Sequence, residues 1–148
     1  MIALGSDHGG FALKEEIKKH LTERGIPFTD YGTDSEASCD YPVYAALVTK
    51  AVASGEAEKG IVICGTGIGI SIAANKVKGI RAALCGDCYS AEMTRRHNDA
   101  NILAMGARVT GSGLALKIVD TFLNTAFEGG RHAKRIALIA ALEERERT

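Results

Sequence analysis

Residues 60–71 read GIVICGTGIGIS, and this stretch decides the fold. The apolar run 60–63 predicts a buried strand, and the residues that follow the glycines, up to Lys76, predict a helix. Glycines at 65, 67 and 69 let backbone N–H groups approach an anion at the positive end of the helix dipole. Cys64 stands at the same turn, where that dipole favours a thiolate. We therefore predict a ligand site that carries its own reactive group.

Strands and helices alternate on both sides of this loop. Apolar runs predict strands at 2–6, 26–31, 60–64, 80–84 and 102–105. Helices are predicted at 11–24, 41–54, 69–76, 89–97, 113–125 and 131–147. This alternation indicates an α/β fold, a three-layer Rossmann-like sandwich with a five-stranded parallel sheet covered on both faces. No linker or internal repeat divides the chain, so we expect a single domain over residues 1–148.

The composition excludes several classes of partner. The 148 residues include 18 basic and 18 acidic side chains, and this balance argues against binding to nucleic acid or to an anionic membrane surface. No apolar stretch approaches the roughly 18 residues of a membrane span, and the N-terminus lacks the pattern of a signal peptide. Four cysteines in such a chain favour reduced thiols. We therefore expect a cytoplasmic protein.

Polar residues and glycines gather where the predicted strands end. They lie at 7–10, 32–33, 64–67 and 85–87, each directly after a strand. In open α/β sheets, ligands bind beyond the carboxyl ends of the strands. We therefore expect a site at this edge of the sheet.

Cys64 has an ordinary interpretation beside the functional one. Buried cysteine is common, and an isolated cysteine at a strand end would most often be a small core residue. The adjoining glycine turn favours function, because core packing does not require it. The loop is not a Walker motif, since Gly-Lys-Ser/Thr is absent, and it follows the third strand rather than the first, where the dinucleotide fingerprint belongs.

Two histidines and two arginines leave alternatives open. His8 lies in Asp-His-Gly-Gly after the first strand, where it could be part of a capping cluster. His97 ends a predicted helix, where a positive side chain can complement the helix dipole. Arg131 and Arg135 share one helix face, which is usually a solvated face but could match a phosphate.

Cys85-Gly86-Asp87-Cys88 has the spacing of a redox or zinc motif. Thioredoxin-like chains place that pair early in the sequence, and a zinc site would need two further ligands that no second Cys-x-x-Cys or His-x-His supplies. We interpret Cys88 as incidental and expect no metal.

Several longer motifs occur in order along nearly the whole chain, at 5–11, 40–42, 63–76, 79–82, 97–101, 118–120 and 128–132. Together they resemble the type B ribose-5-phosphate isomerases and their galactose- and allose-6-phosphate isomerase relatives. The resemblance implies an aldose-ketose isomerase that interconverts ribose 5-phosphate and ribulose 5-phosphate, in the pentose phosphate pathway. Ring opening and proton transfer would pass through a cis-enediolate, without a metal or organic cofactor. A six-carbon substrate such as allose 6-phosphate is the close alternative.

The resemblance also implies roles for individual residues. Cys64 would be the base that moves the proton between C2 and C1, and His97 would open the ring, helped by Thr66 and Asp7. Backbone amides of the loop would stabilise the enediolate, together with the Ser71 hydroxyl; the loop residues are Gly65, Gly67, Ile68 and Gly69. Sugar hydroxyls would meet Asp7, Tyr41 and Asn98, and the phosphate would meet His8, Arg108, Arg131 and Arg135.

Some relatives use a glutamate in the helix after the loop, with serine in place of the cysteine. Ala73, Ala74 and Asn75 occupy that region here, which fits the subgroup that uses cysteine.

Members of the family form dimers with the site at the subunit interface. We therefore expect a homodimer or a dimer of dimers, in which the helix at 131–147 contributes to the interface and His97 and Cys64 come from different chains. A regulatory domain that binds phosphate without catalysis is the alternative from another class. It gives no reason for Cys64, His97 and the paired arginines together.

Overall fold

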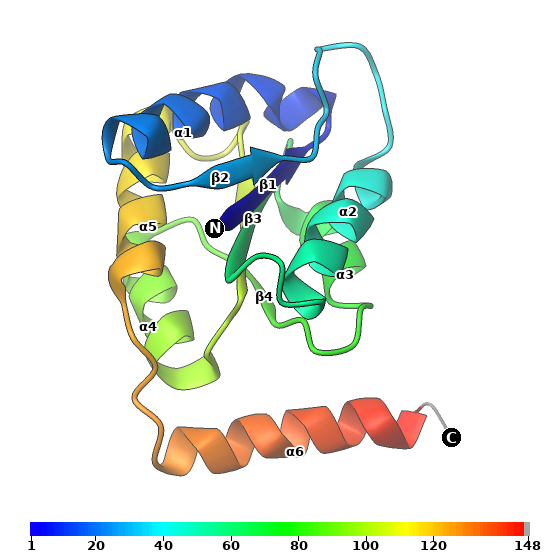
Figure 1. The fold of residues 1–148 in the computed structure, drawn as a ribbon, viewed down its shortest axis with the longest axis vertical. Coiled ribbons are helices and arrows are strands. Elements are labelled where there is room, and N and C mark those ends of the chain that lie inside the picture. Colours follow the sequence, from blue (N-terminus) through cyan, green and yellow to red (C-terminus); the bar gives the residue numbers. More distant parts are fainter. Residues whose placement is uncertain (147–148) are drawn as a thin grey trace.

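A five-stranded, all-parallel sheet forms the centre of the computed structural model, which describes residues 1–146 (Figure 1). The strands stand in the order β2-β1-β3-β5-β4. Their bounds are Ile2–Ser6 for β1, Phe28–Asp30 for β2, Lys59–Cys64 for β3, Ala82–Leu84 for β4 and Ile102–Gly106 for β5. All strands run in the same direction, so their carboxyl ends form one edge, as the sequence predicts.

Helices cover both faces of the sheet and confirm the three-layer α/β prediction. One face carries α1 (Phe11–Glu23), α4 (Cys88–Asn98) and α5 (Ser112–Asn124). The other carries α2 (Tyr41–Ala53) and α3 (Ile68–Ala74). Successive residues of a strand point to opposite faces, so Ile61 and Ile63 join the first core while Val62 and Cys64 join the second. This alternation places the Cys64 side chain beside α2 and α3.

The predicted strand boundaries differ from the structure by two residues at the start of β2 and of β4, and by one residue at the start of β3 and the ends of β2 and β5. β2 begins at Phe28 rather than at residue 26, because Pro27 has no N–H to donate and takes part only through its carbonyl, which accepts from Ile2 N–H at 3.0 Å. β4 begins at Ala82 rather than at residue 80, because the N–H of Ile80 closes a turn onto Val77. A short 3-10 helix, η1 (His8–Gly10), was not predicted.

The last helix, α6 (Arg131–Glu146), lies apart from the three layers (Figure 1). Residue 147, which the sequence assigns to this helix, lies outside the described residues. Most described side chains of α6 are exposed, and Ile139 and Leu142 are about half exposed, at 49% and 51%. Most of the stability of a helix in a protein comes from packing of its apolar face. α6 therefore presents an apolar surface that the described part of the chain does not cover.

No helix in residues 1–146 is both long and apolar enough to cross a membrane.

Candidate functional site

The loop between β3 and α3 holds Cys64 at the carboxyl edge of the sheet. The side chain is 4% exposed, and its Sγ accepts a hydrogen bond from the backbone N–H of Gly67 at 3.2 Å. Gly67 has a φ of 79°, a left-handed conformation that glycine adopts without strain. The turn therefore brings an amide hydrogen to the sulfur, and such a bond strengthens when its acceptor is charged.

Arg108 lies against this loop because the loop after β5 packs on it. The N–H groups of Ala107 and Arg108 donate to the carbonyls of Cys64 at 3.0 Å and Gly65 at 2.9 Å. A Cβ on Gly65 would stand 2.9 Å from Nη1 of Arg108, so a side chain at this position would displace the guanidinium from the loop. The guanidinium thus sits directly beside the cysteine loop.

The loop after β1 completes this part of the site. Asp7 is buried, and its Oδ1 accepts from the N–H of Gly10 at 3.1 Å. A Cβ on Gly9 would lie 3.3 Å from the Gly65 nitrogen and 3.4 Å from both Asp7 Oδ1 and Arg108 Nη2. The loops after β1, β3 and β5 therefore meet at this point.

His8 is oriented by the loop that precedes α2. Its Nδ1 accepts a hydrogen bond from the backbone N–H of Cys39 at 3.2 Å. In the neutral ring the proton is then on Nε2, which can donate to an anion.

Tyr41, Thr66 and Ser71 lie around the start of α3. A Cβ on Gly69 would be 2.6 Å from Cζ of Tyr41, so the tyrosine ring covers this glycine. Thr66 is exposed, and its Oγ1 accepts from the N–H of Ile68 at 3.2 Å. The Ser71 hydroxyl donates back into its own helix, to the Ile68 carbonyl at 2.8 Å. Thr66 and Tyr41 are thus accessible as they stand, whereas the Ser71 proton is engaged.

A second group of predicted site residues surrounds the end of α4 and the start of α6. The ring of His97 stacks on the ring of His132, with centroids 4.2 Å apart and planes 13° apart. His132 is 7% exposed, and burial, followed by the charges of His97 and Arg131, lowers its pKa below the usual 6.5. The sequence motif at 128–132 contains His132, but sequence reasoning gave it no role because the stack joins residues 35 positions apart.

Arg131 and Arg135 stand in the first turns of α6, beside this pair of rings. Both are exposed, and neither forms an ion pair with the described part of the chain. Asn98 ends α4, and its carbonyl accepts from Nε of Arg81 at 2.9 Å. Two guanidinium groups without carboxylate partners, next to two imidazoles, form a positively charged surface that suits a phosphate.

The two groups occupy opposite edges of the sheet. Cys64 ends β3 and pairs in register with Gly106, the last residue of β5. His97 lies in the last turn of α4, just before β5 begins at Ile102. Four residue steps along β5 alone span about 13 Å. One chain therefore does not bring Cys64 and His97 together, and Figure 1 shows α6 beyond the amino ends of the strands.

His97, Glu128 and His132 form the donor set most suited to a metal, with ligand atoms within 4.8 Å of one another. The imidazole lone pairs lie in the ring planes, and two nearly parallel stacked rings do not direct them at a common point. Arg131 and Arg135 also add positive charge to His132. This arrangement fits an anion better than a cation.

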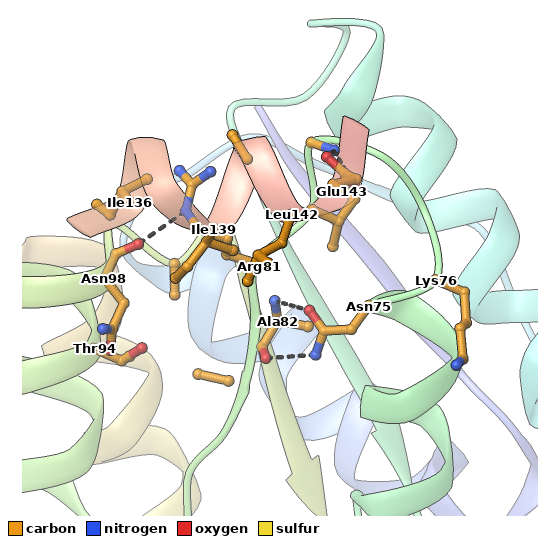
Figure 2. Close-up of a pocket in the computed structure, with 15 residues that line it drawn as sticks. Asn75, Lys76, Arg81, Ala82, Thr94, Asn98, Ile136, Ile139, Leu142 and Glu143 are labelled. Atoms are coloured by element: carbon orange, nitrogen blue, oxygen red, sulfur yellow. Dashed lines mark hydrogen bonds between the residues drawn. The ribbon is translucent and has the colours of Figure 1, made fainter. Parts of the chain in front are cut away.

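A cavity of about 850 Å³ opens at the same edge as His97 (Figure 2). It lies between α6 and the segment that leads into β4. Ile136, Ile139 and Leu142 line it from α6, and Arg81 and Asn98 line it from the body of the chain. Hydrogen bonds from Gly79 N–H to the Glu143 carboxylate and an ion pair of Lys78 with Glu144 tie the far end of α6 to the body. The cavity thus has a largely apolar wall on α6 and a mixed wall of polar and apolar residues on the body of the chain.

The Cys85–Cys88 pair remains reduced, with Cys85 buried and Cys88 partly buried. Burial, with a smaller contribution from Asp87, raises the pKa of the Cys85 thiol to about 11. A thiol with so high a pKa is unreactive near neutral pH, and this supports the interpretation of the motif as incidental.

Comparison with known proteins gives a consistent result. Residues 2–139 match the family described as Ribose/Galactose Isomerase. A curated relative, ribose-5-phosphate isomerase B of Escherichia coli K12, is 56% identical over 144 residues, which cover 97% of each chain.

Solved structures agree with this comparison. A ribose-5-phosphate isomerase B from Clostridium thermocellum superposes with a TM-score of 0.97 at 57% identity and 98% coverage of each chain. A ribose 5-phosphate isomerase from Thermotoga maritima has a TM-score of 0.93 at 53% identity and covers 95% of this chain and 97% of its own.

Proposed function

Because this chain belongs to the ribose/galactose isomerase family, in the branch of the type B ribose-5-phosphate isomerases, we propose that it interconverts ribose 5-phosphate and ribulose 5-phosphate with Cys64 as the base. The observation that carries the mechanism is the hydrogen bond from Gly67 N–H to the Cys64 sulfur, in a glycine turn at the carboxyl edge of the sheet. Isomerisation requires a base that both removes and returns a proton near neutral pH. The pKa of free cysteine, about 8.5, lies close enough to neutral pH for a cysteine to serve as such a base.

The first step opens the sugar ring, and we assign it to His97 of the partner subunit. The ring oxygen gains a proton while the anomeric hydroxyl loses one, so an imidazole that can donate and accept is suited to the step. Thr66 is exposed beside the loop and Asp7 is buried next to it, where they assist. His132 stacks on His97 and orients its ring.

The second step moves the proton between carbons. The Cys64 thiolate takes the proton from C2, the C2–H electron pair forms the C1–C2 double bond, and the charge passes to the C1 oxygen. A proton then passes from the C2 hydroxyl to the C1 oxygen, and return of the Cys64 proton to C1 leaves the ketone at C2 and a hydroxyl on C1. Backbone N–H groups of Gly65 and Gly69 are donors for the enediolate oxygens. Those of Gly67 and Ile68 join them after they leave the Cys64 sulfur and Thr66 Oγ1. Ser71 joins them only after its hydroxyl turns away from the Ile68 carbonyl.

The phosphate binds at the opposite end of the sugar. His8 and Arg108 reach it from one chain, and Arg131 and Arg135 reach it from the partner subunit. Asp7, Tyr41 and Asn98 meet the sugar hydroxyls. Binding energy from a phosphate that does not react holds C1 and C2 over the base.

The separation of the two residue groups supports a site shared by two chains. A symmetric dimer brings the same two surfaces together twice, so each Cys64 loop can receive the His97 edge of the other subunit. Exposed Ile68 and Ile72 on α3 lie beside the Cys64 loop, and the apolar wall of the α6 cavity lies beside His97. Docking one surface onto the other would cover both. We therefore assign α6 to the interface of a homodimer built from single-domain chains, which a dimer of dimers would retain.

The four reduced cysteines suit a cytoplasmic enzyme.

Measurement of ribose 5-phosphate conversion by the wild type and by Cys64→Ala tests the proposal. We expect the wild type to be active and the variant to lose about 10³-fold in kcat, within the range of general-base contributions. Cys85→Ala is the matched control and should retain activity. Equal activity of the wild type and Cys64→Ala would show that Cys64 is not the base. A higher kcat/KM for allose 6-phosphate than for ribose 5-phosphate would assign the six-carbon substrate instead.

A further inference from the structure

The last turn of α4 is held by two arginines that reach it from different parts of the chain. The final carbonyls of a helix have no partner within the helix and must find one elsewhere. Arg81 donates from Nε to the Asn98 carbonyl and from Nη2 to the Asp99 carbonyl, both at 2.9 Å. Arg95 donates from Nη1 to the Ala100 carbonyl at 2.6 Å.

Asp99 joins the two guanidinium groups. Its Oδ1 lies 2.8 Å from Nη1 of Arg95, and its Oδ2 lies 3.6 Å from Nη2 of Arg81. Its backbone has φ 44° and ψ 44°, and Asp99 is the one residue other than glycine with a positive φ in the described chain. A left-handed residue directly after Asn98 turns the chain sharply toward β5. The carboxylate between two cations holds that turn in place.

The cluster of Arg81, Arg95 and Asp99 also reaches the connection to α6. Arg95 is 6% exposed, lies over the ring of Phe122 and donates from Nε to the Thr125 carbonyl at 3.2 Å. Thr125 begins the segment that carries the chain to α6. The cluster therefore connects the turn that bears His97 to the segment that leads to His132.

We propose that Arg81, Arg95 and Asp99 are positioning residues for ring opening, because they fix the end of α4 so that His97 and Asn98 meet the substrate in the partner's site. The inference rests on the proposed function, since it assigns a task to the residues that hold His97. Carboxylate–arginine clusters elsewhere in the chain hold other helices: Asp120, for example, contacts His20 and Arg24 between α1 and α5. The Asp99 cluster differs because the turn it holds directly follows His97 and Asn98.

The chemistry of the two sugars separates ring opening from proton transfer. Ribose 5-phosphate closes into a furanose, so it must be opened before C2 can react. Ribulose 5-phosphate carries its phosphate on the oxygen that would close a furanose, and it is therefore an open chain. Exchange of its C1 proton with deuterium from the solvent requires Cys64 but not ring opening. Loss of the contacts that fix the end of α4 should therefore slow turnover of ribose 5-phosphate and leave proton exchange into ribulose 5-phosphate unchanged.

The test compares Asp99→Asn and Asp99→Gly with the wild type at saturating substrate. Both replacements tolerate a left-handed backbone, and both remove the negative charge. We expect turnover of ribose 5-phosphate to fall at least about tenfold, more in the glycine variant, while deuterium exchange into ribulose 5-phosphate stays within about twofold of the wild type. Asp120→Asn, which breaks a comparable ion pair away from α4, should change neither rate.

Two results would overturn the proposal: unchanged turnover of ribose 5-phosphate in both folded Asp99 variants, or an equal loss of turnover and exchange. Circular dichroism and thermal melting establish that each variant is folded, and Arg81→Lys replaces any Asp99 variant that is not. Failure of the proposed function would look different, because the wild type itself would then neither convert ribose 5-phosphate nor exchange the ribulose 5-phosphate proton.

Discussion

The Cys64 loop and the α6 edge differ in how their residues are supported. Cys64 belongs to the buried core, and three loops joined by backbone hydrogen bonds surround it. Arg131 and Arg135 stand on a helix that is exposed along most of its length. The residue proposed to move a proton is thus held by the fold of its own chain, whereas the arginines proposed to bind the phosphate depend on whatever covers α6. The difference supports the proposal that a second subunit completes the site.

The largest effect is expected from a charge on the apolar wall of α6. Ile139→Asp places a carboxylate in the proposed interface, and a buried contact of this kind contributes about 2 kcal/mol per copy. Because a symmetric dimer contains the contact twice, the dissociation constant should rise about 10³-fold. Light scattering should then show monomers, and activity should be lost at low enzyme concentration.

Lys117→Asp introduces the same group at an exposed position on α5 and should leave the dimer intact. A dimeric, fully active Ile139→Asp protein would show that α6 does not form the interface, and the proposed difference between the Cys64 loop and the α6 edge would be wrong.

A smaller effect is expected from Arg135→Ala. Loss of one charged hydrogen bond to the phosphate, at about 1.5–3 kcal/mol, should raise KM about 10- to 100-fold. Steady-state kinetics with ribose 5-phosphate measure the change in KM. Lys134→Ala is the control, because Lys134 is the adjacent cation and lies on another side of the helix. An unchanged KM would remove Arg135 from the phosphate site and leave only Arg131 on α6.

The smallest effect concerns stability at the His97–His132 stack. The lowered pKa of His132 means that the unfolded chain takes up a proton first as the pH falls below about 6.5, so the native state loses stability below that pH. Above it both states are neutral and the group contributes no pH dependence. His132→Phe keeps an aromatic ring without the proton, and its melting temperature should depend less on pH between 6.5 and 5. The same slope in both proteins would assign the pH dependence to other groups.

Much of the Cys64 half of the site is predictable from sequence, because it depends on local signals. Glycines 65, 67 and 69 after an apolar strand place the loop at the carboxyl edge, and the all-parallel sheet brings Asp7 and Arg108 to the same place. The α6 half depends on contacts between distant segments. His97 stacks on His132, and Arg95 donates a hydrogen bond to the Thr125 carbonyl. Each contact joins residues 30 or more positions apart, and no periodicity in the sequence predicts such contacts.

The boundaries of β2 and β4 have a different, local cause. Apolar residues predicted longer strands, but Pro27 and the turn at Ile80 decide where backbone pairing starts.

Mixing two inactive variants tests the central claim, that each site takes Cys64 from one chain and His97 from the other. Cys64→Ala and His97→Ala homodimers should each be nearly inactive. After dissociation and reassociation, half of the dimers should be mixed, and each mixed dimer contains one site with both residues intact. The mixture should therefore recover about a quarter of the wild-type activity. No recovery, in mixed dimers whose formation is verified by mass spectrometry, would contradict the shared site.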